Sequence, residues 1–146
     1  MKRQMISLTL VLGLAATAVF AHDGVKDPDV KKRMALMGNM RATMAVLGRM
    51  AQGKTAFDPA TAAGAKAAFV KDADAIIAAF KKPAQDPKSE SAPAIWEDFA
   101  DFTAKADAFG AASARLDVST LAQLRAGIGA VGQSCGGCHK AYRIEK

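Results

Sequence analysis

From Leu121 to Tyr142, apolar residues recur at alternating steps of three and four, which is the spacing of one face of an α-helix. Both cysteines of the chain fall on this face. A helix with such a face must bury it, so other elements have to pack against it. The expected face consists of Leu121, Leu124, Ile128, Val131, Cys135, Cys138 and Tyr142.

Three earlier segments show the same periodicity, and no strand-like alternation of any length accompanies them. Asp followed by Pro supplies an N-cap and a first helical residue at two of the starts. Gly53 and Pro83 are expected to end the first two helices. The expected starts are Asp27-Pro28, Asp58-Pro59, the neighbourhood of Pro93, and the residues after Asp117. Short connections between four amphipathic helices predict an all-α chain folded as an antiparallel four-helix bundle.

The apolar faces predicted for the first three helices are equally regular. Methionine is prominent in the first, and phenylalanine in the second and third. The faces are Val30, Met34, Met37, Met40, Met44 and Leu47, then Phe69, Ala73, Ile76 and Phe80, then Ile95, Phe99, Phe102, Ala106 and Phe109. Five glycines from 127 to 137 lower the helix propensity of the last helix, and they suggest that something bulky approaches its backbone.

Residues 1–21 have the form of a secretory signal: a basic start, an apolar run, and small residues up to Ala21. An uncleaved anchor is the alternative, although the apolar run is short for a membrane span. Cleavage would leave residues 22–146 as one exported, periplasmic domain that no longer spans the membrane. Loss of Lys2 and Arg3 would lower the formal net charge from +6 to about +4.

The mature chain is therefore only mildly basic. No basic run is interleaved with aromatic residues, which argues against nucleic acid as a partner. A basic face would suit an acidic partner, and an ordinary solvated surface is the alternative. Because no nucleophile with a base, no paired carboxylates and no phosphate-binding loop occur, we do not expect an enzyme.

The stretch "CGGCH", residues 135–139, has the spacing that attaches c-type haem. Residues three apart lie on the same side of a helix, so Cys135 and Cys138 can both react with the vinyl groups at one edge of a porphyrin. The next residue, His139, is turned about 100° further round and can reach the iron.

Other uses of these residues are less well matched. A redox-active disulfide favours the start of a helix that follows a strand. A structural zinc ion is usually coordinated by four protein ligands, whereas Cys135, Cys138 and His139 supply three. A structural disulfide would close a very small loop and add little stability. His22 with the new N-terminal amine could bind copper, although no second histidine supports such a site.

On these residues the chain resembles the class II c-type cytochromes, which include cytochrome c′. The resemblance rests on "CGGCHKAYR" near the C-terminus, "PAIW" at Pro93–Trp96, and "GKTAFDPA" between the first two helices. It implies an up-down-up-down bundle, one covalent haem c on Cys135 and Cys138, and His139 as the proximal iron ligand. Arg143 would pair with a haem propionate or orient the proximal side. Family members are often homodimers through their first two helices.

The sixth iron ligand divides this family, and the sequence offers several methionines for it. A methionine ligand indicates an electron carrier that passes single electrons between redox partner proteins. An open position permits nitric oxide or carbon monoxide to bind. By resemblance, Arg33 and Gly53 indicate Met37 as the distal ligand, whereas anchoring on "GRM" at 48–50 indicates Met40. A methionine stripe is also ordinary core packing, and Trp96 and Tyr142 are expected to pack as well.

Overall fold

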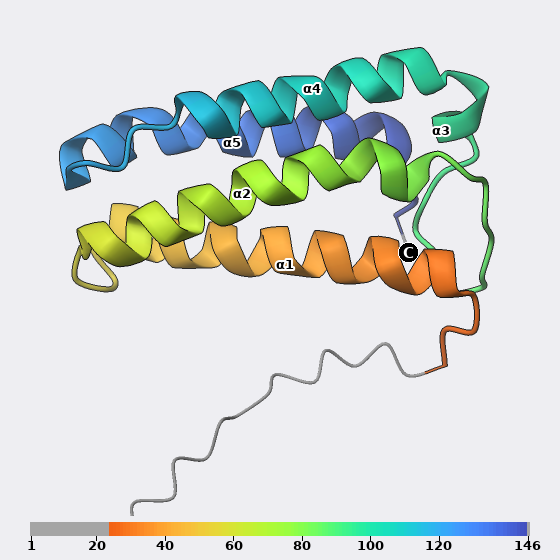
Figure 1. Ribbon diagram of the computed structural model, residues 1–146, viewed down its shortest axis with the longest axis horizontal. Coiled ribbons are helices and arrows are strands. Elements are labelled where there is room, and N and C mark those ends of the chain that lie inside the picture. The colour runs from red at the N-terminus through yellow and green to blue at the C-terminus, as the bar shows by residue number, and fades with distance from the viewer. Residues whose placement is uncertain (1–23, 146) are drawn as a thin grey trace, which may run out of the picture.

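The computed structural model describes residues 24–145, and helices occupy most of that range (Figure 1). The expected signal segment and His22 lie outside the described residues. The helices are α1 (Pro28–Ala51), α2 (Pro59–Phe80), α3 (Ala94–Glu97), α4 (Phe99–Arg115) and α5 (Leu121–Tyr142). None of these described helices is long and apolar enough to cross a membrane.

The four long helices form an antiparallel bundle, which confirms the predicted fold class. Each packs on the next: α1 on α2, α2 on α4, α4 on α5, and α5 back on α1. Figure 1 shows that successive long helices run in opposite directions. The C-terminal end of α5 consequently lies at the same end of the bundle as the start of α1 and the end of α2.

Capping residues set the helix boundaries where the sequence predicted them. The Asp27 carboxylate accepts hydrogen bonds from the backbone N–H of Asp29 at 2.8 Å and of Val30 at 3.0 Å. Asp58 does the same for Thr61 at 2.7 Å. After α1, Gly53 adopts φ 72°, a left-handed conformation that glycine accepts at little cost and that turns the chain toward α2.

The prediction of one continuous third helix was wrong at Asp98. This residue has φ −131° and ψ 70°, and it separates the single turn of α3 from α4. Its carboxylate accepts a hydrogen bond from the N–H of Asp101 at 3.0 Å and caps a new helix. A short polar side chain can compete in this way with the helical backbone. The apolar periodicity continues across the break, and Ile95 and Phe102 are both buried.

Most residues of the predicted apolar faces meet in one core, whereas Val30 and Met34 pack in a smaller cluster with Val25 and Ala84. Phe102 of α4 contacts Phe80 of α2 and Tyr142 of α5, with ring centroids 5.1 and 5.4 Å apart. Phe69 and Phe109 form an edge-to-face pair at 5.7 Å. These contacts tie α2, α4 and α5 together, because aromatic pairs in this geometry are attractive beyond the area they bury.

The polar connection between α2 and α3 is bonded to the residues just before α1 and to the end of α5. The Asp86 carboxylate accepts hydrogen bonds from the N–H of Lys26 at 2.8 Å and of Asp27 at 3.3 Å. Further along, Ser91 forms an antiparallel bridge with Arg143. This connection therefore crosses the end of the bundle at which α5 finishes.

Candidate haem-attachment site

Cys135 and Cys138 lie in the second half of α5, where both pack against the core and are partly buried. Both are free thiols. Side chains three residues apart on a regular helix are about 5–6 Å apart at Cβ, further than a disulfide spans. Burial raises the pKa of both thiols, so they stay protonated at neutral pH. The geometry thus presents two separate thiols on one side of the helix and disfavours the disulfide alternatives.

His139 follows on the adjacent side of α5, and its side chain is exposed. It lines a surface hollow of about 600 Å³ together with Glu90, Gly136, Lys140, Arg143 and Glu145. Nearby protein atoms displace solvent and lower the pKa of His139; the positive charge of Arg143 lowers it further, and Glu90 opposes the shift. A neutral imidazole is the form that binds a metal.

The surface of α5 beside the cysteines is free of bulky neighbours. A Cβ atom added at Gly129, Gly132 or Gly136 would meet no atom within 4 Å. Of the neighbouring pairs of long helices, α1 and α5 also share the smallest contact. Gly127 has a different role: a Cβ there would lie 2.8 Å from Leu116, so this glycine lets the preceding connection pack closely.

The methionines of α1 divide into two groups by burial. Met40 is 8% exposed and belongs to the main core with Leu36 and Leu47. Met37 packs against the same core and is only partly buried, as is Met44. Met37 is therefore the less enclosed of the two methionines that the sequence indicated as distal ligands.

Arg33, one turn before Met37, is 2% exposed and makes contacts that the sequence did not indicate. Its Nε donates to the carbonyl oxygen of Ala79 at 2.9 Å and its Nη1 to that of Ala84 at 3.2 Å. A third hydrogen bond runs from Nη2 to the carbonyl oxygen of Lys82. These acceptors lie at the C-terminal end of α2 and just beyond it, where helix carbonyls lack partners and a cation is favoured.

Aromatic rings enclose the same guanidinium. Arg33 Cζ lies 5.0 Å from the ring centroid of Phe80 and 5.0 Å from that of Trp96. The indole N–H of Trp96 donates to the carbonyl oxygen of Phe80 at 2.8 Å. Trp96 therefore packs, as predicted, and Arg33 joins α1 to the end of α2 and to α3. The only sequence signal for this cluster was an arginine on an otherwise apolar face.

Tyr142 and Arg143, at the C-terminal end of the site, differ in burial and in their hydrogen-bond partners. Tyr142 is buried, and its hydroxyl donates to the Asp101 carboxylate at 2.6 Å. That bond raises the pKa of Tyr142 to about 12. Arg143 is exposed, and its Nε donates to the Glu90 carboxylate at 2.7 Å. Glu90 lies in the α2–α3 connection and was not predicted as a site residue, because nothing local marks it.

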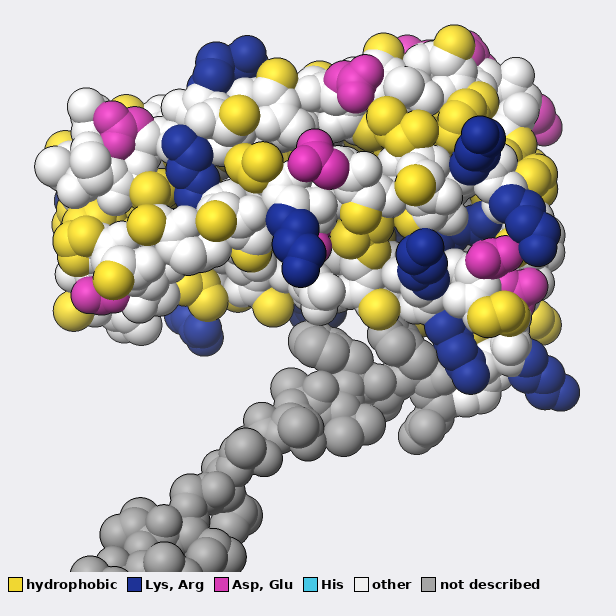
Figure 2. All heavy atoms as spheres, in the orientation of Figure 1, with side chains coloured by type: hydrophobic (Ala, Val, Ile, Leu, Met, Phe, Trp, Pro, Cys, Tyr) yellow, Lys and Arg dark blue, Asp and Glu magenta, His cyan; other side chains and the backbone are white. Residues whose placement is uncertain are grey.

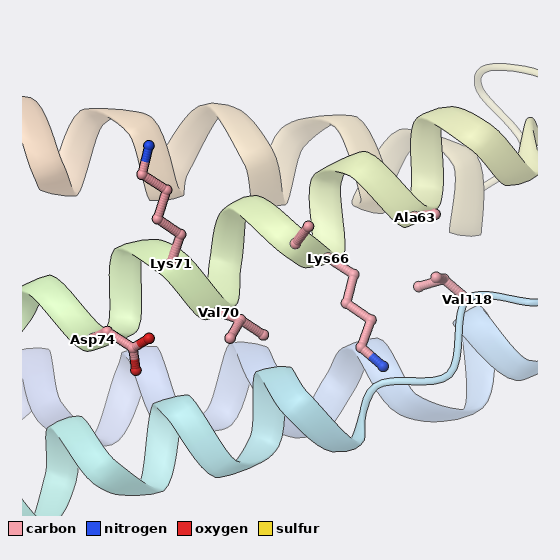
Figure 3. Close-up of a pocket in the computed structure, with 7 residues that line it drawn as sticks. Ala63, Lys66, Val70, Lys71, Asp74 and Val118 are labelled. Atoms are coloured by element: carbon pink, nitrogen blue, oxygen red, sulfur yellow. The ribbon is translucent and has the colours of Figure 1, made fainter.

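A second hollow, of about 510 Å³, lies on α2 and is shown in Figure 3. Val70 and Val118 contribute apolar side chains, and Lys66, Lys71 and Asp74 contribute charged ones. It contains none of the predicted site residues, and α2 lies across the bundle from α5. This hollow is therefore separate from the residues predicted to hold the haem.

The α5 residues fit a covalently attached haem. Two half-buried thiols lie one helical turn apart, an imidazole follows directly, and the adjoining glycines leave the backbone approachable. Within residues 24–145, no three His, Cys, Asp or Glu side chains gather into a metal site of their own, so the described residues give a zinc site no support.

Known proteins match this chain over most of its length. The family model described as Cytochrome C′ matches residues 29–143. Cytochrome c-556 of Agrobacterium fabrum is 32% identical over 151 residues, covering 100% of this chain and 99% of that protein.

Solved structures match as well. Cytochrome c′ from Rhodopseudomonas palustris superposes with a TM-score of 0.75 and 28% identity, covering 83% of this chain and 99% of that one. A nitric oxide complex of a variant cytochrome c′ from Alcaligenes xylosoxidans gives a TM-score of 0.72 at 30% identity, covering 80% and 94%.

Proposed function

Because this chain belongs to the cytochrome c′ family and so carries one covalent haem c, we propose that it is a periplasmic electron carrier. Cys135 and Cys138 hold the haem, and His139 is the proximal ligand. When bound, haem supplies a one-electron couple, while the protein supplies binding, orientation and electrostatics. The observation that carries this proposal is the placement of all three side chains within little more than one turn of α5, with two partly buried thiols and an exposed imidazole on adjacent sides of the helix.

We assign the distal ligand to Met37. Its side chain is only partly buried, whereas that of Met40 is enclosed in the core. The anchor at Arg33 fixes α1 one turn earlier, so the backbone at Met37 has little freedom to shift along the bundle. Methionine opposite histidine is the ligand pair of electron-carrying c-type cytochromes. The comparisons give the family and lean toward its gas-binding members, so support for a methionine ligand comes from the difference in burial alone.

The second candidate function is binding of nitric oxide or carbon monoxide at an open iron position. Several similar solved structures are nitric oxide complexes of the Alcaligenes xylosoxidans cytochrome c′, which favours this alternative. In that case Met37 would pack beside the haem without binding the iron.

One experiment separates the two functions. Visible spectra of the purified holoprotein are recorded oxidised and reduced, with and without carbon monoxide. The electron-carrier proposal expects a low-spin reduced form with a sharp alpha band and no rapid response to carbon monoxide. A high-spin spectrum with fast carbon monoxide binding would establish the gas-binding function instead.

The charge distribution supports an acidic redox partner. Figure 2 shows several Lys and Arg side chains, with fewer Asp and Glu side chains among them, over the end of the bundle where α1 begins and α2 ends. Exposed lysines at this end include Lys31, Lys32, Lys81 and Lys82. His139 lies at the same end, so a partner attracted there would approach near the haem. Electron transfer to an acidic partner should slow as ionic strength rises.

Three further parts of the proposal need their own measurements. Intact mass of periplasmic protein should equal residues 22–146 plus one haem, which also checks cleavage after Ala21. Light scattering at several concentrations tests the homodimer that the family resemblance implies. Assays with redox mediators alone test the view that the protein transfers electrons without transforming a substrate.

A further inference from the structure

The hollow beside His139 has a wall that does not belong to the haem-binding helix. Glu90, from the α2–α3 connection, lines it opposite Lys140 and Arg143 of the α5 end. The Glu90 carboxylate accepts a hydrogen bond from Arg143 Nε at 2.7 Å, and the two groups form an ion pair. A segment distant in sequence therefore contributes a charge to the surroundings of the proximal histidine.

Backbone hydrogen bonds fix the main chain that carries the Glu90 side chain. They do not involve the carboxylate, so they should remain when its charge is removed. The N–H of Ile144 donates to the carbonyl oxygen of Glu90 at 2.8 Å, and the N–H of Ala92 donates to that of Tyr142 at 3.0 Å. Between them lies the antiparallel bridge of Ser91 and Arg143. Both ion-pair partners thus sit on short extended segments that are joined to each other by their main chains.

Arg143 is in turn tied to the turn that carries the histidine. Its N–H donates to the carbonyl oxygen of His139 at 3.0 Å and closes the last turn of α5. Its side chain could extend into solvent like that of most exposed arginines. The Glu90 carboxylate instead holds it along the hollow that His139 lines.

We propose that Glu90 is a positioning residue of the haem site: it holds Arg143 beside His139, offsets its positive charge, and so helps set the midpoint potential of the iron. This inference rests on the proposed attachment through Cys135, Cys138 and His139. It does not depend on whether Met37 is a ligand.

The direction of the effect follows from Coulomb's law. Reduction adds an electron to the iron, so a nearby positive charge favours the reduced state and a negative charge favours the oxidised state. The paired charges largely cancel. The side chains of Arg143 and Glu90 are 53% and 44% exposed, so dissolved salt screens both of them.

A double-mutant cycle on the holoprotein tests the proposal, with Glu90→Gln, Arg143→Gln and the double variant. Midpoint potentials are measured at about 0.01 M and about 1 M salt, where the screening length falls from about 30 to about 3 Å. Glu90→Gln should raise the potential, Arg143→Gln should lower it, and the double variant should lie between them. All shifts should shrink at high salt.

Two controls make the result specific. Asp74→Asn removes one exposed carboxylate from α2, across the bundle, and should leave the potential unchanged. Glu90→Asp keeps the charge on a shorter side chain, and its potential should fall between wild type and Glu90→Gln. Because Asp74→Asn and Glu90→Asp retain the backbone pairing and keep Arg143 in place, their visible spectra and melting temperatures should match wild type closely.

The proposal is overturned if Glu90→Gln shifts the potential no more than Asp74→Asn does. It is also overturned if Glu90→Asp behaves like Glu90→Gln, or if the two single shifts have the same sign. Absence of haem from the wild-type protein would instead contradict the proposed function, and the mass and spectrum reveal that before any titration.

Discussion

Helix α1 packs extensively on α2 and only lightly on α5, and the two contacts are built from different kinds of residue. At the end of α2, buried Arg33 meets three carbonyl groups and two aromatic rings. Helix α5 instead carries open glycines, half-buried thiols and an exposed histidine. The difference shows that one helix can be anchored firmly to one neighbour and packed only lightly on another. The following predictions test that division.

Removing the thiols should have the largest effect, because the proposed attachment of the haem depends on both of them. Cys135→Ser combined with Cys138→Ser should leave a polypeptide whose intact mass lacks haem. Its melting temperature should fall strongly, since a group bound only by the native state stabilises it. Ser134→Ala, next to Cys135, is the matched control and should keep its haem. Wild-type protein with the mass of the bare chain would refute the haem assignment.

The two methionines should separate packing from ligation. Met40→Ala removes a buried side chain and should cost roughly 2–5 kcal/mol in the free energy of unfolding, with the visible spectrum unchanged. Met37→Ala should open the iron, convert it to high spin, lower the midpoint potential and allow rapid carbon monoxide binding. If Met40→Ala alone changed the spectrum, Met40 would be the ligand.

Loss of the α1–α2 anchor should destabilise the fold. Arg33→Met keeps much of the side-chain volume but leaves three main-chain carbonyls without their donor, which should cost about 2–4 kcal/mol. Denaturant unfolding measures this change. Arg41→Met, an exposed position on the same helix, should change stability by less than about 0.5 kcal/mol. If the two variants lowered the free energy of unfolding equally, the buried hydrogen bonds of Arg33 would add no more stability than an exposed arginine does.

The smallest expected effect is a pH dependence of stability that comes from the hydrogen bond between Tyr142 of α5 and Asp101 of α4. The pKa of Tyr142 is raised to about 12, chiefly by its hydrogen bond to Asp101. Neutral Tyr142 therefore stabilises the native state fully below about pH 10, the unfolded value, and this contribution is lost as pH rises toward 12. Tyr142 is the single tyrosine of the chain, so tyrosinate absorbance reports it directly.

The tyrosinate titration has two internal checks. Native protein should titrate well above the unfolded chain, and Tyr142→Phe should show no tyrosinate step. The same bond lowers the pKa of Asp101, so its stabilising effect should persist above about pH 4 and disappear as pH falls through the lower native value. A Tyr142 titration near pH 10 in native protein would mean that the bond to Asp101 does not form in solution.

The sequence by itself determined the helix starts, the apolar faces and the attachment turn. Each depends on residues within a few positions of one another: Asp before Pro, apolar steps of three and four, and thiols three apart followed by histidine. Such signals act through local backbone geometry, which is the same wherever the segment lies. The prediction failed locally only at Asp98, where a capping side chain interrupted a periodicity that continues beyond it.

Only the tertiary structure decided which partners the charged residues find and which methionine is less enclosed. Arg33 bonds with Ala79 across 46 positions, and Arg143 pairs with Glu90 across 53. Met37 and Met40 are indistinguishable as members of one apolar stripe, and they differ only once α2, α4 and α5 surround them. Contacts of this range depend on how the helices pack. The residues on either side of each partner in the sequence do not indicate which distant residue it will contact.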